Sequence, residues 1–130
     1  MASNITVDTL TKGSTTLNTD EIVDTNSNQI CKAWVNFDQR TGALAIKNSY
    51  NVSSVTDNGT GDATINFSTA MANSNYAFTG SCNEAGGSSW GNQVNLLYAA
   101  TTSSQRILTG YSNGWAINDC NRVEIAVFGD

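Results

Sequence analysis

The chain has 130 residues, a net charge of −5 and no histidine. This length suits one domain with a modest core. The six basic residues are scattered along the sequence, so no basic stripe neutralises phosphates, which argues against nucleic acid as a partner. The uncharged segments hold too many Asn, Ser and Thr residues for membrane insertion, and the N-terminus lacks the apolar stretch of a secretory signal. We expect a protein that is made in a cytoplasm.

The polar load of the chain is unusual. Asn, Thr and Ser account for 47 of the 130 residues, and only 13% of the residues are charged, against roughly 25% in an ordinary globular domain. Surface polarity therefore comes from amides and hydroxyls, which cost less to desolvate than charges do. This composition suits a rigid β surface or a subunit interface.

Residues 1–29 differ from the rest of the chain. The segment has no aromatic residue, and its aliphatic residues are isolated, so it cannot bury enough surface to fold alone. Pairing with other copies or with a partner protein could still order it. We expect an extended N-terminal arm for attachment or oligomerisation, with "NITVDTL" (4–10) as a short strand.

Residues 30–130 show strand periodicity. In "ICKAWVNFD" (30–38), every second residue is apolar, which places Ala33, Val35 and Phe37 on one face. In "DATINFST" (62–69), Ala63 and Ile65 alternate with polar residues in the same way. About eight such strands follow at short, regular spacing, with turn-forming residues between them. The pattern predicts an all-β fold, an antiparallel β-sandwich or jelly-roll-like domain.

The stretch "DNGTGDATINF" (57–67) could be a metal loop, a phosphate loop or a hairpin turn. A calcium loop of the EF-hand type would need a distal glutamate, which is missing. A phosphate loop would need a lysine at the start of a helix, whereas here the glycines open a strand. The dipeptide Asn58-Gly59 readily takes positive φ, so we expect a hairpin turn at these two residues.

Neither a metal site nor a cofactor is expected elsewhere. Cys31, Cys82 and Cys120 are far apart, no CxxC spacing occurs and histidine is absent, so a structural zinc site is excluded. Buried free thiols are the simplest interpretation in a cytoplasmic product. Cys31 and Cys120 lie at opposite ends of the strand-rich region and could approach each other in a closed sandwich.

No catalytic residues emerge from the sequence. General acid–base chemistry at neutral pH usually depends on histidine, and the many serines have no base to activate them. Most acidic residues fall at predicted turns or in the arm, where aspartate commonly caps the backbone. We expect a protein that is not an enzyme.

Two tryptophans in predicted loops suggest a binding surface. Trp90 lies in a Gly- and Ser-rich loop and Trp115 lies in "YSNGWAIND" (111–119). A ring beside amides and carboxylates could stack on a sugar while the polar groups contact its hydroxyls. The same rings could instead plug the end of the sandwich or pack across a subunit boundary. The candidate ligand-binding residues are Trp90, Asn92, Tyr111, Asn113, Trp115 and Asp119.

The runs "CKAWVNFD" (31–38) and "GALAIKNSYNVSSVTDNGTGDATINFSTAMANSNYAFTG" (42–80) resemble a segment of structural proteins from tailed bacteriophages, notably marine and cyanobacterial phages. There the segment is commonly labelled tail fibre or virion appendage. The start "MASNITVDTL" also resembles the openings of such proteins. The resemblance covers residues 1–12 and 31–80, roughly half of the chain. Tail fibres are usually long, so this short chain favours a small tip, a short fibre or a capsid-decorating knob.

The resemblance implies a non-enzymatic virion protein that forms a homotrimer, because phage fibres are typically threefold. Residues 1–29 would bind another virion protein or intertwine three chains, and the loops at 83–92 and 110–119 would touch host-surface glycans. The alternative is a capsid cement or decoration protein that stabilises or ornaments the head. A free-standing lectin is the third possibility.

Overall fold

A computed structural model describes residues 9–12, 15–18, 30–40, 44–83, 92–96, 99–111 and 116–129. Within these ranges the chain forms β-strands joined by turns and irregular segments, and no helix occurs. Eight of the strands form two four-stranded antiparallel sheets. The expected all-β sandwich is therefore confirmed.

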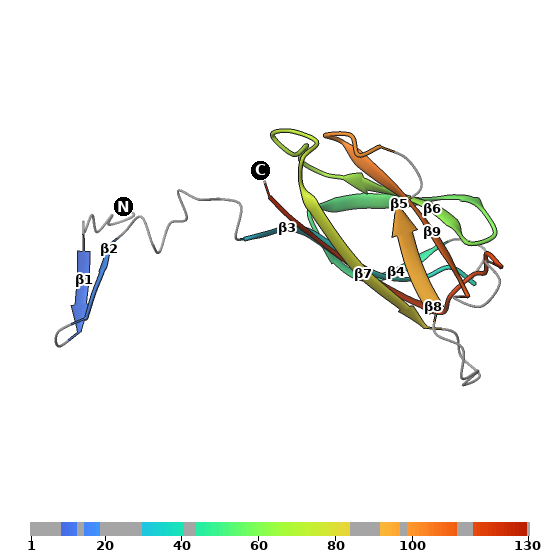
Figure 1. Cartoon of the computed structure of the whole chain (residues 1–130), viewed down its shortest axis with the longest axis horizontal. Helices are drawn as coiled ribbons and strands as arrows, with labels where there is room; N and C mark the ends of the chain where they lie inside the picture. The colour runs from blue at the N-terminus through green and yellow to red at the C-terminus, as the bar shows by residue number, and fades with distance from the viewer. Residues whose placement is uncertain are drawn as a thin grey trace, which may run out of the picture.

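The two sheets pack face to face (Figure 1). The first has the strand order β4-β3-β10-β7 and contains β3 (Cys31–Asp38), β4 (Ala45–Tyr50), β7 (Ala77–Asn83) and β10 (Arg122–Phe128). The second has the order β5-β6-β9-β8 and contains β5 (Val52–Gly59), β6 (Asp62–Phe67), β8 (Asn92–Leu96) and β9 (Ser104–Tyr111).

The core lies between the sheets and follows the alternation of the sequence. In β3, Ala33, Val35 and Phe37 are all buried, and the residues between them are partly exposed. The expected inward face of this strand is confirmed. The strands β6, β9 and β10 show the same period of two, since successive side chains point to opposite faces of a sheet. The other buried apolar residues are Ala63, Ile65, Phe67, Met71, Tyr76, Ile107, Cys120, Val123, Ile125 and Val127.

The N-terminal segment contains a hairpin. Strands β1 (Thr9–Lys12) and β2 (Thr15–Asn18) pair antiparallel, with Leu10 opposite Leu17. Eight residues of the expected extended arm therefore form two short paired strands. Of the strand expected at 4–10, Thr9 and Leu10 lie in β1, and residues 4–8 lie outside the described ranges. A local pairing of this kind satisfies backbone groups without a large apolar core.

The hairpin between β5 and β6 is present, but its turn differs from the expected one. Positive φ occurs at Gly59 (130°) and Gly61 (65°) and not at Asn58. The strand register shifts between Asp57 and Gly59, so the turn includes a bulge rather than two turn residues alone. The side chain of Asn58 instead donates hydrogen bonds to its neighbours across the hairpin, at 2.8 Å to Thr64 Oγ1.

The sandwich has two ends. We call the end at which β3 begins the base and the opposite end the apex. At the base, Phe128 of β10 lies opposite Cys31 of β3, so the chain begins and finishes the sandwich on neighbouring strands (Figure 1). The Tyr76 hydroxyl donates to the Thr101 carbonyl at 3.0 Å and joins the sheets there. Burial raises the pKa of Tyr76.

The apex is closed by a buried polar side chain. Gln39 follows β3 and is 5% exposed. Its Oε1 accepts hydrogen bonds from Thr109 Oγ1 at 2.7 Å and from the backbone N–H of Cys120 at 3.1 Å. Thr109 belongs to the other sheet, so Gln39 bridges the two layers.

An ion pair on the outer face of the second sheet gives the fold a pH dependence. Arg106 donates from Nε to Asp62 Oδ1 at 2.8 Å and from Nη2 to Oδ2 at 2.6 Å. These hydrogen bonds lower the pKa of Asp62 below 3.8, while burial acts in the opposite direction. Because the folded state has the lower pKa, the pair stabilises the protein above the unfolded pKa, and this contribution is lost as the pH falls through the lowered pKa.

We therefore expect Asp62→Asn to lower the free energy of unfolding by about 1 kcal/mol at neutral pH, the upper end for a partly exposed pair. The difference from the wild type should shrink steadily as the pH falls below the usual carboxylate pKa. Urea denaturation of both proteins across this pH range measures the effect. A difference that stays constant into strong acid would contradict the assignment.

Candidate functional site

The apex holds the sequence-predicted residues that the structure describes. Asn92 at the start of β8 lies opposite Tyr111 at the end of β9. The Tyr111 hydroxyl accepts a hydrogen bond from Asn118 Nδ2 at 3.3 Å. Asn92 Oδ1 is buried and has no hydrogen-bond partner among the described residues. Two residues that are distant in the sequence are therefore brought together at this end.

Asp119 also lies at the apex, where one of its oxygens has a structural role. Its Oδ1 accepts a hydrogen bond of 2.6 Å from the backbone N–H of Gly61, which ties the β5–β6 turn to the segment before β10. Trp90, Asn113 and Trp115 lie outside the described residues. The proposed contact of these residues with a sugar stays a prediction.

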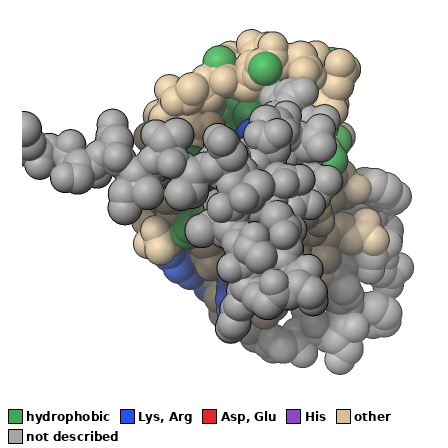
Figure 2. Space-filling view, turned by 90° about the vertical axis from the view of Figure 1, so that its left-hand side faces the viewer, with side chains coloured by type: hydrophobic (Ala, Val, Ile, Leu, Met, Phe, Trp, Pro, Cys, Tyr) green, Lys and Arg blue, Asp and Glu red, His purple; other side chains and the backbone are tan. Residues whose placement is uncertain are grey.

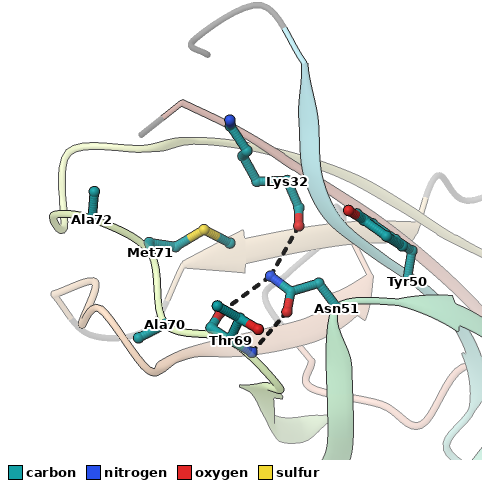
Figure 3. A pocket seen from close by; sticks show the side chains of 7 residues that line it. All are labelled: Lys32, Tyr50, Asn51, Thr69, Ala70, Met71 and Ala72. Atoms are coloured by element: carbon teal, nitrogen blue, oxygen red, sulfur yellow. Dashed lines mark hydrogen bonds between the residues drawn. The ribbon is translucent and has the colours of Figure 1, made fainter. Parts of the chain in front are cut away.

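A pocket at the base was not predicted from the sequence. It has a volume of about 410 Å³ and is lined by Lys32, Tyr50, Asn51 and the segment Thr69–Ala72. Figure 3 shows Lys32 and Tyr50 on one side, the four residues of the segment on the other, and Asn51 between them. The segment belongs to the connection from β6 to β7, so the pocket joins both sheets.

Asn51 holds the two walls of the pocket together. It lies between β4 and β5 with a φ of 53°, a left-handed conformation that asparagine adopts more readily than most residues. Its Nδ2 donates to the carbonyls of Lys32 at 3.0 Å and Thr69 at 3.1 Å, and its Oδ1 accepts from the Thr69 N–H at 2.7 Å. The walls are thus fixed before any ligand arrives (Figure 3).

Lys32 differs from the other charged residues of the sandwich in its surroundings. It has no carboxylate within 4.0 Å among the described residues. Within residues 30–129, every other described basic side chain has one, in the pairs Arg40–Asp38, Lys47–Asp38, Arg106–Asp62 and Arg122–Glu124. The remaining described carboxylates, Asp57 and Asp119, accept backbone N–H groups. Among the described residues, no carboxylate competes with a ligand for the ammonium at the pocket.

Comparison with known proteins followed three routes. No protein-family model, curated protein or solved structure matches this chain.

The cysteines are not arranged as expected, because Cys31 does not approach Cys120. All three are free. The thiol of Cys82 is hydrogen-bonded with the thiol of Cys120, so Cys82, and not Cys31, is the neighbour of Cys120. This hydrogen bond lowers the pKa of Cys82, against the effect of burial. Neither thiol has a histidine beside it, since the chain contains none.

The described part of the chain also lacks metal-ligand clusters and membrane-spanning helices. No group of three Cys, Asp or Glu side chains in the described ranges could hold a metal ion. None of the described segments is a helix that could span a membrane.

The pocket could not be found from sequence patterns. Its lining comes from three segments that are 18 or more residues apart, and no short motif connects them. The one local signal is Asn51, because an asparagine directly between two strands is a common position for a left-handed turn residue. That signal indicates a turn and says nothing about a ligand.

Proposed function

We propose that this chain is a non-enzymatic structural protein of a tailed-phage virion, a short tail fibre or fibre tip that contributes to attachment to host-surface glycans. Residues 1–29 bind another virion protein in this proposal, and three copies assemble as a homotrimer. The resemblance of residues 31–80 to phage appendage proteins supports this class. The protein would act by binding, with no chemical step.

One observation carries the proposal. The chain joins the sandwich at the base, where β3 begins, while Asn92 and Tyr111 lie together at the apex. The loops predicted to contact the host leave from the same apex, since β7 ends there at Asn83 opposite Arg122. A tether at one end and the predicted contact loops at the other is the layout that an attachment protein needs.

Adsorption of altered virions tests the role of the loops. We expect Trp90→Ala and Trp115→Ala virions to lose at least about ten-fold in adsorption rate, because an aromatic ring in a binding site commonly contributes more than 1.4 kcal/mol. Thr79→Ala, an exposed substitution on β7, serves as the control and should adsorb normally. Unchanged adsorption of both tryptophan variants would contradict the glycan contact.

An exposed apolar side chain gives the alternative some support. Ile30, at the base, is 50% exposed, and an exposed apolar side chain can pack against another protein. A capsid cement or decoration protein would use such a contact against the shell. Electron microscopy of tagged virions separates the two functions, since it places the protein at the tail or on the capsid. A stable monomer in sedimentation would contradict the trimer.

A further inference from the structure

The pocket at the base presents a positive charge in an acidic protein. Among the described residues that line the pocket, Lys32 is the one with a charged side chain. Figure 2 views the molecule from the side where β3 begins in Figure 1 and shows basic side chains among the described atoms that are not covered. An ammonium without a nearby carboxylate attracts anionic ligands, and it attracts them more strongly beside a low-dielectric wall.

The rest of the lining suits a sugar ring. Tyr50 is 58% exposed, so its ring face and hydroxyl are accessible at the pocket. Met71 is buried in the core, with 6% of its surface exposed, and lines the opposite side of the pocket with an apolar edge. A pyranose ring carries C–H faces and hydroxyl groups, and therefore matches an aromatic surface beside hydrogen-bonding groups. The hydroxyl of Thr69 adds a second hydrogen-bonding group.

The shape of the pocket is already set. Its volume of about 410 Å³ lies within the range of roughly 300–1,000 Å³ that is typical of ligand pockets. The three side-chain hydrogen bonds of Asn51 fix the backbone at Lys32 and Thr69. A ligand would consequently spend little free energy on ordering these two segments.

We propose that this pocket binds an acidic saccharide, with the ammonium of Lys32 against the anionic group and the ring of Tyr50 against the sugar. The site is distinct from the apical loops, which lie at the other end of the sandwich. An acidic peptide would use the same charge, but the lining residues Ala70 and Ala72 are small and exposed and form no deep slot for a peptide side chain.

A titration of the isotope-labelled full chain, followed by NMR, tests the proposal. The ligands are trigalacturonate, which carries carboxylates, galactose 6-sulfate, and neutral galactose. We expect the amide signals of Asn51, Thr69 and Met71 to shift with the acidic sugars. The acidic sugars should bind about five-fold more tightly than galactose, as expected for one partly exposed ion pair. The ratio between trigalacturonate and galactose 6-sulfate identifies the preferred anionic group.

Three variants assign the contacts. Lys32→Gln should reduce the affinity for the acidic sugars to that for galactose, and Tyr50→Ala should abolish binding of all three ligands. Lys47→Gln is the matched control, because Lys47 lies on the neighbouring strand and already pairs with Asp38; its affinity should be unchanged. All three positions have exposed or half-buried side chains, and the amide spectrum of each variant verifies its fold.

The proposal is overturned by any of three results. The first is that acidic and neutral sugars bind with equal affinity. The second is that Lys47→Gln and Lys32→Gln lose the same amount of affinity. The third is that an aspartate-rich hexapeptide binds more tightly than trigalacturonate. Apical tryptophan variants should leave this titration unchanged. The outcome is thus independent of the adsorption experiment.

Discussion

Gly61→Ala should lower the free energy of unfolding by about 4 kcal/mol, combining the cost of a left-handed φ with that of overpacking. A Cβ on Gly61 would lie 2.6 Å from the Thr109 carbonyl oxygen and 2.8 Å from the Asn118 nitrogen. Both contacts are with backbone, which cannot rotate away. The turn is also fixed on both sides, because the Gly61 carbonyl accepts from the Thr109 N–H and its own N–H donates to Asp119.

Gly59→Ala is the matched control for this substitution. Gly59 also has positive φ, but a Cβ there would meet nothing within 4 Å, so the tip of the hairpin can shift to relieve the strain. We expect a loss of about 1–2 kcal/mol for Gly59→Ala. Urea denaturation of both variants measures the difference. Equal losses would show that the close approach at Gly61 is unimportant.

Gln39→Leu should lower the free energy of unfolding by about 3 kcal/mol. The leucine side chain has a similar volume to glutamine, but it provides no acceptor for the buried donor that Gln39 satisfies. The backbone N–H of Cys120 donates to Gln39 Oε1 and would have no acceptor in the variant. The Thr109 hydroxyl would be affected less, since the Asn118 carbonyl lies 2.7 Å from it as an alternative acceptor.

The control for this effect is Gln93→Leu, which replaces an exposed glutamine on β8 and should change stability by less than about 0.5 kcal/mol. A double-mutant cycle between Gln39→Leu and Thr109→Val measures the direct coupling of the two side chains, expected at about 1 kcal/mol. A Gln39→Leu variant as stable as the Gln93 control would contradict the role of the bridge.

The fold class was predictable because a half-buried strand repeats its pattern every two residues. Ala33, Val35 and Phe37 are buried as that period requires. The turn after β5 was predicted at the right place, and Gly59 has the expected positive φ, but the other residue with positive φ is Gly61 and not Asn58. Asn58-Gly59 is a strong turn signal, yet Gly61 must pack against Thr109 and Asn118. That tertiary contact determines the conformation, and no local pattern reports it.

Sites formed by distant segments were only partly predictable. The pairing of Asn92 with Tyr111 could be anticipated only in the sense that both flank loops with tryptophans. The pocket at Lys32 depends on a strand start, a turn and a long connection that come together through the sheet order. A sequence pattern holds no information on such an arrangement until the topology is known.

The position of the chain ends also determines how the sandwich would respond to force. Cys31, at the start of β3, and Phe128, at the end of β10, are neighbours on antiparallel strands at the base. A force that pulls these two residues apart would break the β3–β10 hydrogen bonds one after another. A load between the tether at residue 30 and a contact at the apex would instead run along the strands, perpendicular to their ladder bonds. Many bonds would then bear the force together, so the domain would be mechanically stiff along this direction.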